Sequence, residues 1–80
     1  MTTQKAIALR VSNLLIKNKL TRYAFCKKIA MPKETLKSII DERYKTVKLD
    51  TIILICEGFG MSLSEFFNDD LFNINNLDIN

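Results

Sequence analysis

The sequence contains no histidine and only two glycines, one proline and two cysteines in 80 residues. Without histidine, neither a Ser–His or Cys–His catalytic pair nor an imidazole zinc ligand is available. Cys26 and Cys56 are too few for a four-thiolate zinc site or for a disulfide scaffold. The scarcity of glycine and proline argues against an all-β fold with many tight turns. Because no glycine-rich phosphate loop is present either, we expect no enzyme, no metal site and no cofactor.

Long hydrophobic runs are also missing. The longest one, residues 52–56, is far shorter than the ~20 residues of a membrane helix, and the chain does not begin like a signal peptide. With 48% hydrophobic and 26% charged residues, it is expected to form one small folded domain. We expect a cytoplasmic protein without membrane contact. A chain of 80 residues leaves no room for a second, ligand-sensing domain, so no small-molecule effector is expected.

The charges are divided unevenly along the chain. All 12 Lys and Arg residues lie within residues 1–48, which hold only three acids, so this half carries a net charge of +9. Residues 49–80 hold six acids and no cation, which gives −6 and a total of +3. A basic half of this density is typical of a protein that binds a polyanion, although a solvated surface also carries charge.

Apolar residues recur at the spacing of a helix face through most of the chain. This spacing predicts an all-α domain of five helices, over residues 4–18, 22–30, 32–41, 49–59 and 63–67, with a loop over 42–48. The fourth segment is apolar on nearly all sides, which predicts that it is the central helix.

The residue types at the segment ends support these bounds. Thr21 can cap the second helix with its hydroxyl oxygen. Pro32 ends that helix and suits the first turn of the next one. Gly60 is expected in the left-handed conformation that ends a helix. Ser62 and Glu65 have the spacing of a capping box, which predicts a helix start.

The second and third predicted helices form a helix-turn-helix. The two helices must cross closely, and Cys26 supplies a small residue at the crossing while Ala30 supplies one in the turn. Residues 20–39 and 49–67 resemble the lambda-repressor-like, Cro/CI (XRE-type) helix-turn-helix DNA-binding domains. The second stretch ends in the signature of this family, which here reads Phe59-Gly60-Met61-Ser62 and then Glu65-Phe66-Phe67. The resemblance covers about residues 7–67 and implies a five-helix lambda-repressor-like fold.

The chain departs from the family pattern at five positions. The family usually has Gln where Arg22 stands, Ala where Cys26 stands and Gly where Ala30 stands. Pro32 replaces the Ser or Thr that caps the third helix, a cap worth about 1 kcal/mol. Glu42 stands where a glycine often ends that helix.

The resemblance implies a set of DNA contacts. The positions that face base edges in the major groove are matched by Lys33, Glu34, Lys37 and Ser38. The positions near phosphates are matched by Thr21, Arg22, Arg43, Tyr44 and Lys45. A lysine can donate to guanine O6 and N7, and a glutamate can accept from cytosine N4. Solvated lysines, a first-turn acid at Glu34 and a Tyr44 packed on its own loop are the alternatives.

We interpret residues 1–67 as this domain and residues 68–80 as an Asn/Asp-rich apolar tail. The expected function is sequence-specific binding of double-stranded DNA by a small transcriptional regulator, a Cro-like or prophage-type repressor. Such domains generally bind as homodimers on half-sites about 34 Å apart. The residues expected to form the dimer contact are Phe67, Leu71, Phe72, Ile74, Leu77 and Ile79.

Two alternatives remain open. One is an antitoxin-type interaction module whose acidic C-terminal half binds a partner protein. The other is a binder of RNA or single strands, for which the basic half offers few aromatic side chains for stacking.

Overall fold

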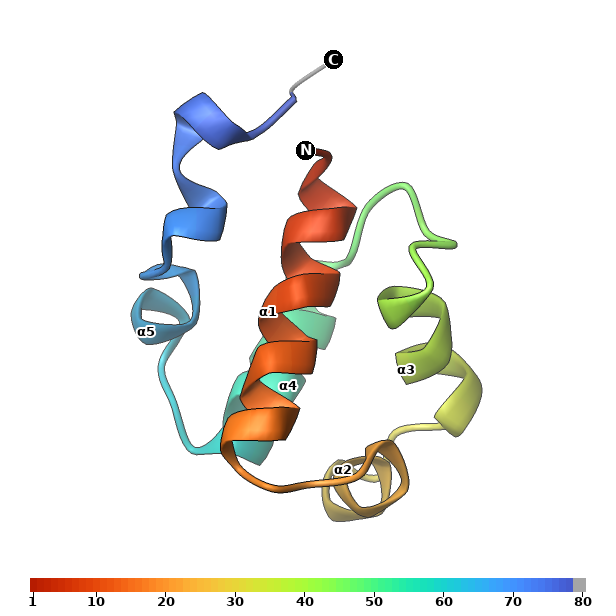
Figure 1. Ribbon diagram of the computed structural model, residues 1–80. Helices are drawn as coiled ribbons and strands as arrows, with labels where there is room; N and C mark the ends of the chain where they lie inside the picture. The colour runs from red at the N-terminus through yellow and green to blue at the C-terminus, as the bar shows by residue number, and fades with distance from the viewer. Residues whose placement is uncertain (79–80) are drawn as a thin grey trace.

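The computed structural model describes residues 1–78 and is all-helical over that range. The five predicted helices are present, and two short 3-10 helices follow them (Figure 1). Their bounds are α1 Thr3–Lys17, α2 Arg22–Ile29, α3 Lys33–Ile40, α4 Leu49–Phe59, α5 Leu63–Phe67, η1 Asp70–Phe72 and η2 Ile74–Asn76. Within residues 1–78 the only β-type pairing is one isolated parallel bridge between Thr2 and Asp78.

The helices enclose one apolar core. In Figure 1, α1 runs down the middle, α4 lies behind it, α2 crosses below, and α3 and α5 flank the two sides. Each α-helix contributes at least one side chain that is almost completely buried: Val11, Phe25, Leu36, Ile39, Ile55 and Phe66. No polar or charged residue in the described chain is buried with them. Burial of apolar surface therefore holds the five helices in place.

Helix α4 is not the central helix that its apolar sequence predicts. It buries Ile52, Ile55 and Cys56 on one side, while Leu49 remains 56% exposed and Ile53 37% exposed. Helix α1 has six buried residues and packs against α3 and η1. The prediction is wrong because neighbouring helices cover only one face of α4.

The helix ends confirm the local signals in the sequence. The Thr21 hydroxyl accepts a hydrogen bond from the Ala24 backbone N–H at 3.0 Å. Gly60 ends α4 with a left-handed φ of 67°. The capping box of α5 is complete, because Ser62 Oγ accepts from the Glu65 N–H and Glu65 accepts from the Ser62 N–H. These bonds from Ser62 hold the pKa of Glu65 below its ordinary value.

The third helix begins one residue later than expected. Pro32 occupies the N-cap position, no side chain caps the helix, and Lys33 is the first helical residue. The turn before it requires Ala30 in the left-handed region, with φ of 54°. Glu42, which stands where the family often has glycine, also has a positive φ, of 59°. The loop over 42–48 follows from there, as predicted.

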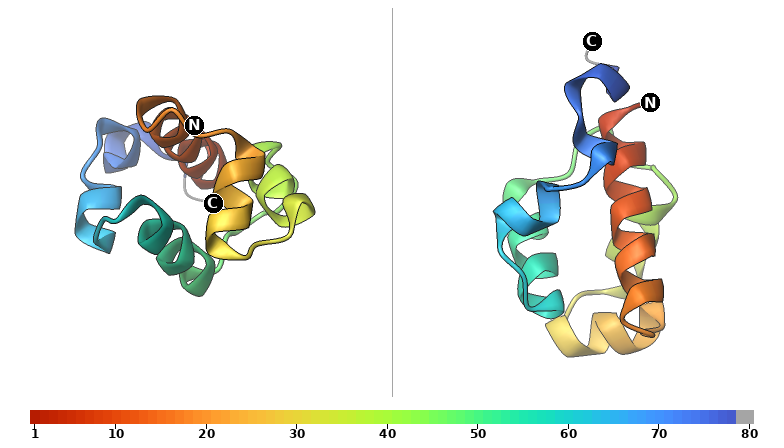
Figure 2. Two further views of the ribbon diagram at one scale, coloured as in Figure 1. Left: turned by 90° about the horizontal axis from the view of Figure 1, so that it is seen from below. Right: turned by 60° about the vertical axis from the view of Figure 1, so that its left-hand side comes forward.

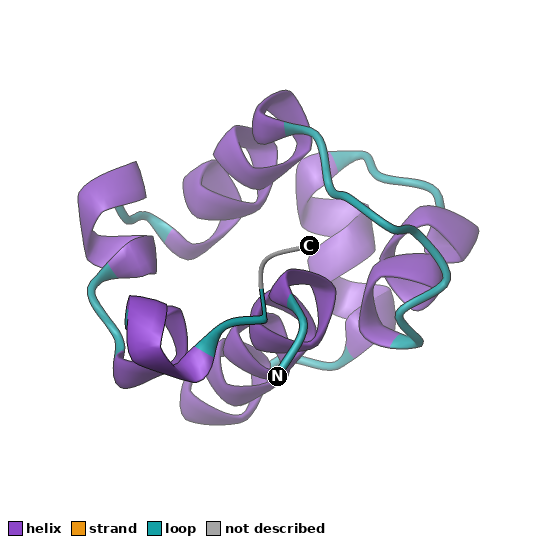
Figure 3. Ribbon diagram, turned by 90° about the horizontal axis from the view of Figure 1, so that it is seen from above, coloured by secondary structure: helices purple, strands orange, loops and turns teal. Residues whose placement is uncertain are grey.

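Helix α5 and the tail both pack against α1 and the residues before it. The Arg10 guanidinium donates to the Phe66 carbonyl at 2.7 Å and to the Glu65 carbonyl at 2.9 Å, and pairs with the Asp69 carboxylate at 3.3 Å. The Phe72 ring lies edge-on to Phe67, with centroids 4.9 Å apart. Figure 3 shows the end of the described chain passing beside the start of α1, where the Thr2–Asp78 bridge forms. The division of function between residues 1–67 and 68–80 stays a prediction.

Candidate nucleic-acid interface

Helices α2 and α3 are joined by a tight turn and lie side by side at one end of the molecule (Figure 2, left). Their inward sides and the turn between them hold buried apolar residues, namely Phe25, Cys26, Ile29, Met31, Leu36 and Ile39. Their polar residues are therefore left on the outer sides. This is the arrangement that lets the second helix of a helix-turn-helix project from the surface.

The outer face of α3 bears three of the four residues predicted at base edges. Lys33, Glu34 and Lys37 are exposed, whereas Ser38 is half-buried. Lys33 and Lys37 are four residues apart, so they share one face of the helix. Among residues 1–78 none of these three forms a salt bridge.

The residues predicted near phosphates fall into two groups. Thr21 and Arg22 lie at the start of α2, both exposed, where the positive end of the helix dipole favours an anion. Arg43 and Lys45 are exposed in the loop after α3. Arg43 also lies 3.7 Å from the Asp41 carboxylate, a surface pair that contributes little to stability.

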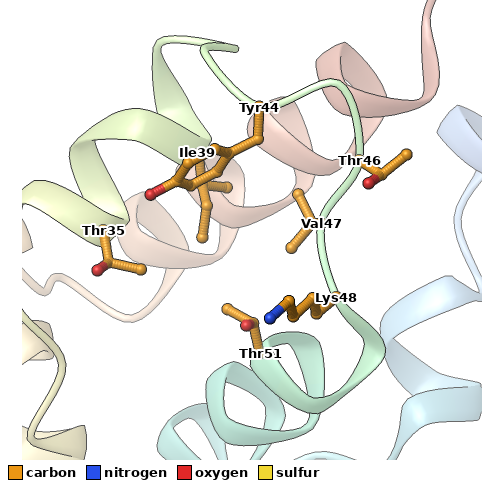
Figure 4. Close-up of a pocket in the computed structure, with 7 residues that line it drawn as sticks. All are labelled: Thr35, Ile39, Tyr44, Thr46, Val47, Lys48 and Thr51. Atoms are coloured by element: carbon orange, nitrogen blue, oxygen red, sulfur yellow. The ribbon is translucent and has the colours of Figure 1, made fainter.

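Tyr44 packs on its own loop, which was one of the two alternatives that the sequence left open, and its phosphate contact stays a prediction. Together with six other residues it lines a cavity of about 310 Å³ between α3, the loop and the start of α4 (Figure 4). Its ring lies back towards Thr35 and Ile39 of α3, yet part of the side chain remains exposed. The tyrosine therefore packs the loop against α3 and keeps an exposed edge.

Tyr23 is a residue of this surface that the sequence reasoning did not assign to the site. It is 60% exposed on α2, and the Lys33 Nζ lies 5.1 Å from the centroid of its ring. The two residues are ten positions apart, and their contact depends on the crossing angle of α2 and α3. Because no pattern in the sequence gives that angle, the contact could not be predicted from neighbouring residues.

Both cysteines have the properties of core residues. Burial raises the pKa of Cys26, and the positive charge of Lys33 acts in the opposite direction. Burial likewise raises the pKa of Cys56, against the charge of Arg10. Both side chains therefore stay protonated at neutral pH. In the part of the chain that the structure describes, no three His, Cys, Asp or Glu side chains gather as a metal site would require.

The tail residues predicted at a dimer contact differ in exposure. Ile74 is 75% exposed and Phe67 is also exposed, while Leu71, Phe72 and Leu77 are half-buried. Ile79 lies outside the described residues. None of the helices within residues 1–78 has the length and apolar character needed to cross a membrane.

Comparison with known proteins identifies the family. The family model of the Cro/C1-type HTH DNA-binding domain matches residues 10–70, which is most of the chain and includes all of α2, α3, α4 and α5. Searches of the curated proteins and of the solved structures give no match. The domains of this family bind DNA in transcription regulators. With its five helices in the expected order, the chain belongs to the Cro/C1-type helix-turn-helix DNA-binding domains.

Proposed function

We propose that this protein is a small repressor of the Cro-like or prophage type that reads a DNA operator in the major groove with α3. The observation that supports this is the two-sided character of α3. Leu36 and Ile39 fix its inner side in the core, while Lys33, Glu34 and Lys37 occupy its free outer side. An α-helix fits the width of the major groove, where each base pair offers its own pattern of donors and acceptors.

The proposed contacts separate into those that read bases and those that position the protein. Lys33 and Lys37 donate to guanine, and Glu34 accepts from cytosine N4. Ser38 is half-buried, so its base contact requires close approach of α3. The contacts that position the protein on phosphates come from Thr21, Arg22, Arg43, Tyr44 and Lys45. A cytoplasmic location, where such a repressor meets DNA, belongs to the same proposal.

Fluorescence anisotropy on duplex DNA, measured across a salt series, tests the proposal. Log affinity is expected to fall with log salt at about −0.9 per phosphate contacted. Arg22→Ala is expected to weaken binding to all duplexes and to reduce the salt slope by about 1. Lys33→Ala is expected to cost about tenfold on a selected operator, because one base contact is worth about 1–3 kcal/mol.

Lys28→Ala is the matched control for these variants. It also removes one positive charge from the helix-turn-helix, but Lys28 lies on the side of α2 that faces Leu54 and Glu57 of α4. The Lys28→Ala substitution is expected to change the affinity for duplex DNA by less than twofold. If the protein does not bind duplex DNA at about 50 mM salt, a condition that favours phosphate contacts, the repressor proposal is wrong and the antitoxin-type interaction module replaces it. Equal affinity for single strands would instead support the single-strand binder.

We further propose that the protein binds as a homodimer through the tail, using Phe67, Leu71, Phe72, Ile74, Leu77 and Ile79. The exposure of Ile74 supports this, because a large apolar side chain at 75% exposure gains most from burial in a partner. Ile74→Asp is expected to halve the mass measured by sedimentation equilibrium and to weaken binding to a two-half-site operator.

Ile16→Asp provides the control for the dimer experiment. Ile16 is equally exposed, at 76%, but lies on α1 outside the tail. The same charge placed there is expected to leave the mass unchanged. A dimer that survives Ile74→Asp, or that is lost equally with Ile16→Asp, would contradict the assignment to the tail.

A further inference from the structure

The contact between Tyr23 and Lys33 links the two helices of the helix-turn-helix on their outer side. Tyr23 is the second residue of α2, and Lys33 is the first residue of α3. The Lys33 ammonium lies 5.1 Å from the centroid of the Tyr23 ring, within the range of a cation–π interaction. The ring is mostly exposed, so its contact with the lysine is not explained by core packing.

A second observation places the Lys33 side chain back over α2. Tyr23, Cys26 and Lys33 line the same shallow hollow, of about 300 Å³, beside the turn between the helices. The lysine therefore has a preferred position before any ligand arrives.

This preference matters because lysine is by itself a poor reader of sequence. Its ammonium is a point charge on a flexible stem of four carbons, and it can reach phosphates and several bases equally well. A ring that restricts the stem reduces the number of acceptors within reach. Contacts formed from a restricted side chain also lose less conformational entropy on binding.

We propose that Tyr23 is a positioning residue that directs the Lys33 ammonium to one base edge and so sets the selectivity of that lysine for guanine. The inference rests on the proposed function, since it concerns how α3 reads the major groove. Tyr23 acts through Lys33, so its removal changes discrimination between bases more than it changes affinity for DNA in general.

A double-mutant cycle tests this proposal on an operator selected with the wild-type protein. The base pair read by Lys33 is identified first. It is the pair whose substitution lowers the operator affinity of the wild-type protein but not that of Lys33→Ala. Discrimination at that pair is then measured for Tyr23→Leu and Tyr23→Phe. Tyr23→Leu is expected to lower it about two- to fivefold, the range of an exposed cation–π contact. Tyr23→Phe keeps the ring face and is expected to retain discrimination.

Lys37 provides the matched control for the cycle. It lies on the same face of α3, and among residues 1–78 it forms no cation–π contact. Tyr23→Leu is expected to have no effect in the Lys33→Ala background but its full effect in the Lys37→Ala background. An unchanged discrimination in Tyr23→Leu, or an equal loss in both backgrounds, would overturn the proposal. Matching thermal midpoints show that each variant is folded.

A measurement without DNA separates this inference from the proposed function. In the free protein, the ring current of Tyr23 is expected to shift the Lys33 ε-methylene protons upfield of those of Lys37. The shift should vanish in Tyr23→Leu and persist in Tyr23→Phe. Its absence in the wild-type protein overturns the positioning role even if duplex binding is strong. If the wild-type protein shows the shift but does not bind duplex DNA, both the repressor function and the role of Tyr23 in base selectivity are wrong.

Discussion

Replacing Gly58 by alanine is expected to lower the free energy of unfolding by about 2 kcal/mol, although alanine is the better helix former. A Cβ at this position would lie 2.7 Å from the Phe25 ring and closer still to Ile29 Cγ2. Real Cβ atoms do not approach other atoms this closely. Overpacking of a core costs about 1–3 kcal/mol, and we expect the upper end here. The gain in helix propensity of about 1 kcal/mol offsets only part of that cost.

The same substitution is expected to weaken DNA binding about tenfold or more. At Gly58, α4 lies directly against the Phe25 and Ile29 side chains of α2, so the added methyl group must displace α2 or these side chains. Base contacts within the groove require a fixed position of the helix-turn-helix, and losing one costs about 1–3 kcal/mol. Urea unfolding followed by circular dichroism, together with anisotropy on the selected operator, measures both effects.

Gly60→Ala separates the steric effect from the loss of a glycine. Gly60 has a φ of 67°, and a Cβ there would meet nothing within 4 Å. The cost is therefore the left-handed backbone alone, about 1 kcal/mol, with no change in DNA affinity. If Gly58→Ala is as stable as the wild type, the close approach of α2 and α4 is not a constraint on this fold.

Arg10→Met is expected to lower the free energy of unfolding by about 3 kcal/mol. The Arg10 side chain is 14% exposed, and its guanidinium donates to the carbonyls of Glu65 and Phe66 near the end of α5. Methionine preserves most of the volume but removes the side-chain donors to the Phe66 carbonyl and to the Asp69 carboxylate, and it leaves the Glu65 carbonyl with only the 3.3 Å bond from the Asn68 N–H. Each polar group left unsatisfied in partly buried surroundings costs about 1–3 kcal/mol, reduced here because Asp69 remains in contact with water.

Asp69→Asn is the control that separates the contribution of the Arg10–Asp69 ion pair from that of the hydrogen bonds between Arg10 and the backbone carbonyls. The amide oxygen can still accept from the Leu71 N–H, a bond that the carboxylate makes at 2.9 Å. We expect a loss of at most about 1 kcal/mol, typical of a partly exposed pair. Chemical denaturation of both variants at neutral pH gives the comparison. An Asp69→Asn variant as unstable as Arg10→Met would mean that the ion pair, rather than the bonds to the backbone, holds α5.

The sequence predicted those features that depend on neighbouring residues. The starts of α2 and α5 are set by Thr21 and by the pair Ser62 and Glu65, each acting within three positions of the chain. Gly60 marks the end of α4 by its own backbone conformation. These signals require no knowledge of the tertiary structure, so the order of the helices and the ends marked by these residues could be derived.

Features that depend on distant residues could not be derived in this way. Arg10 is 56 positions from Phe66, and within the sequence it is one of 12 cations in a basic half. The structure removes it from the charge available to a polyanion. The apolar pattern of α4 likewise shows which side chains can be buried, but not how many neighbours will cover them. The contact of Tyr23 with Lys33 depends on a crossing angle that only the packed core fixes.

The bonds that join the first helix to the last segment also restrict when the protein can complete its fold during synthesis. The carbonyl partners of Arg10 are residues 65 and 66, and the β-bridge of Thr2 is formed with Asp78. Helix α1 is synthesised before the groups that finish its packing. While residues 65–78 are still in the exit tunnel, Arg10 has neither its carbonyl partners nor the Asp69 carboxylate beside it. Emergence of these residues, rather than synthesis of the helix-turn-helix, is therefore the step that completes the packing of α1.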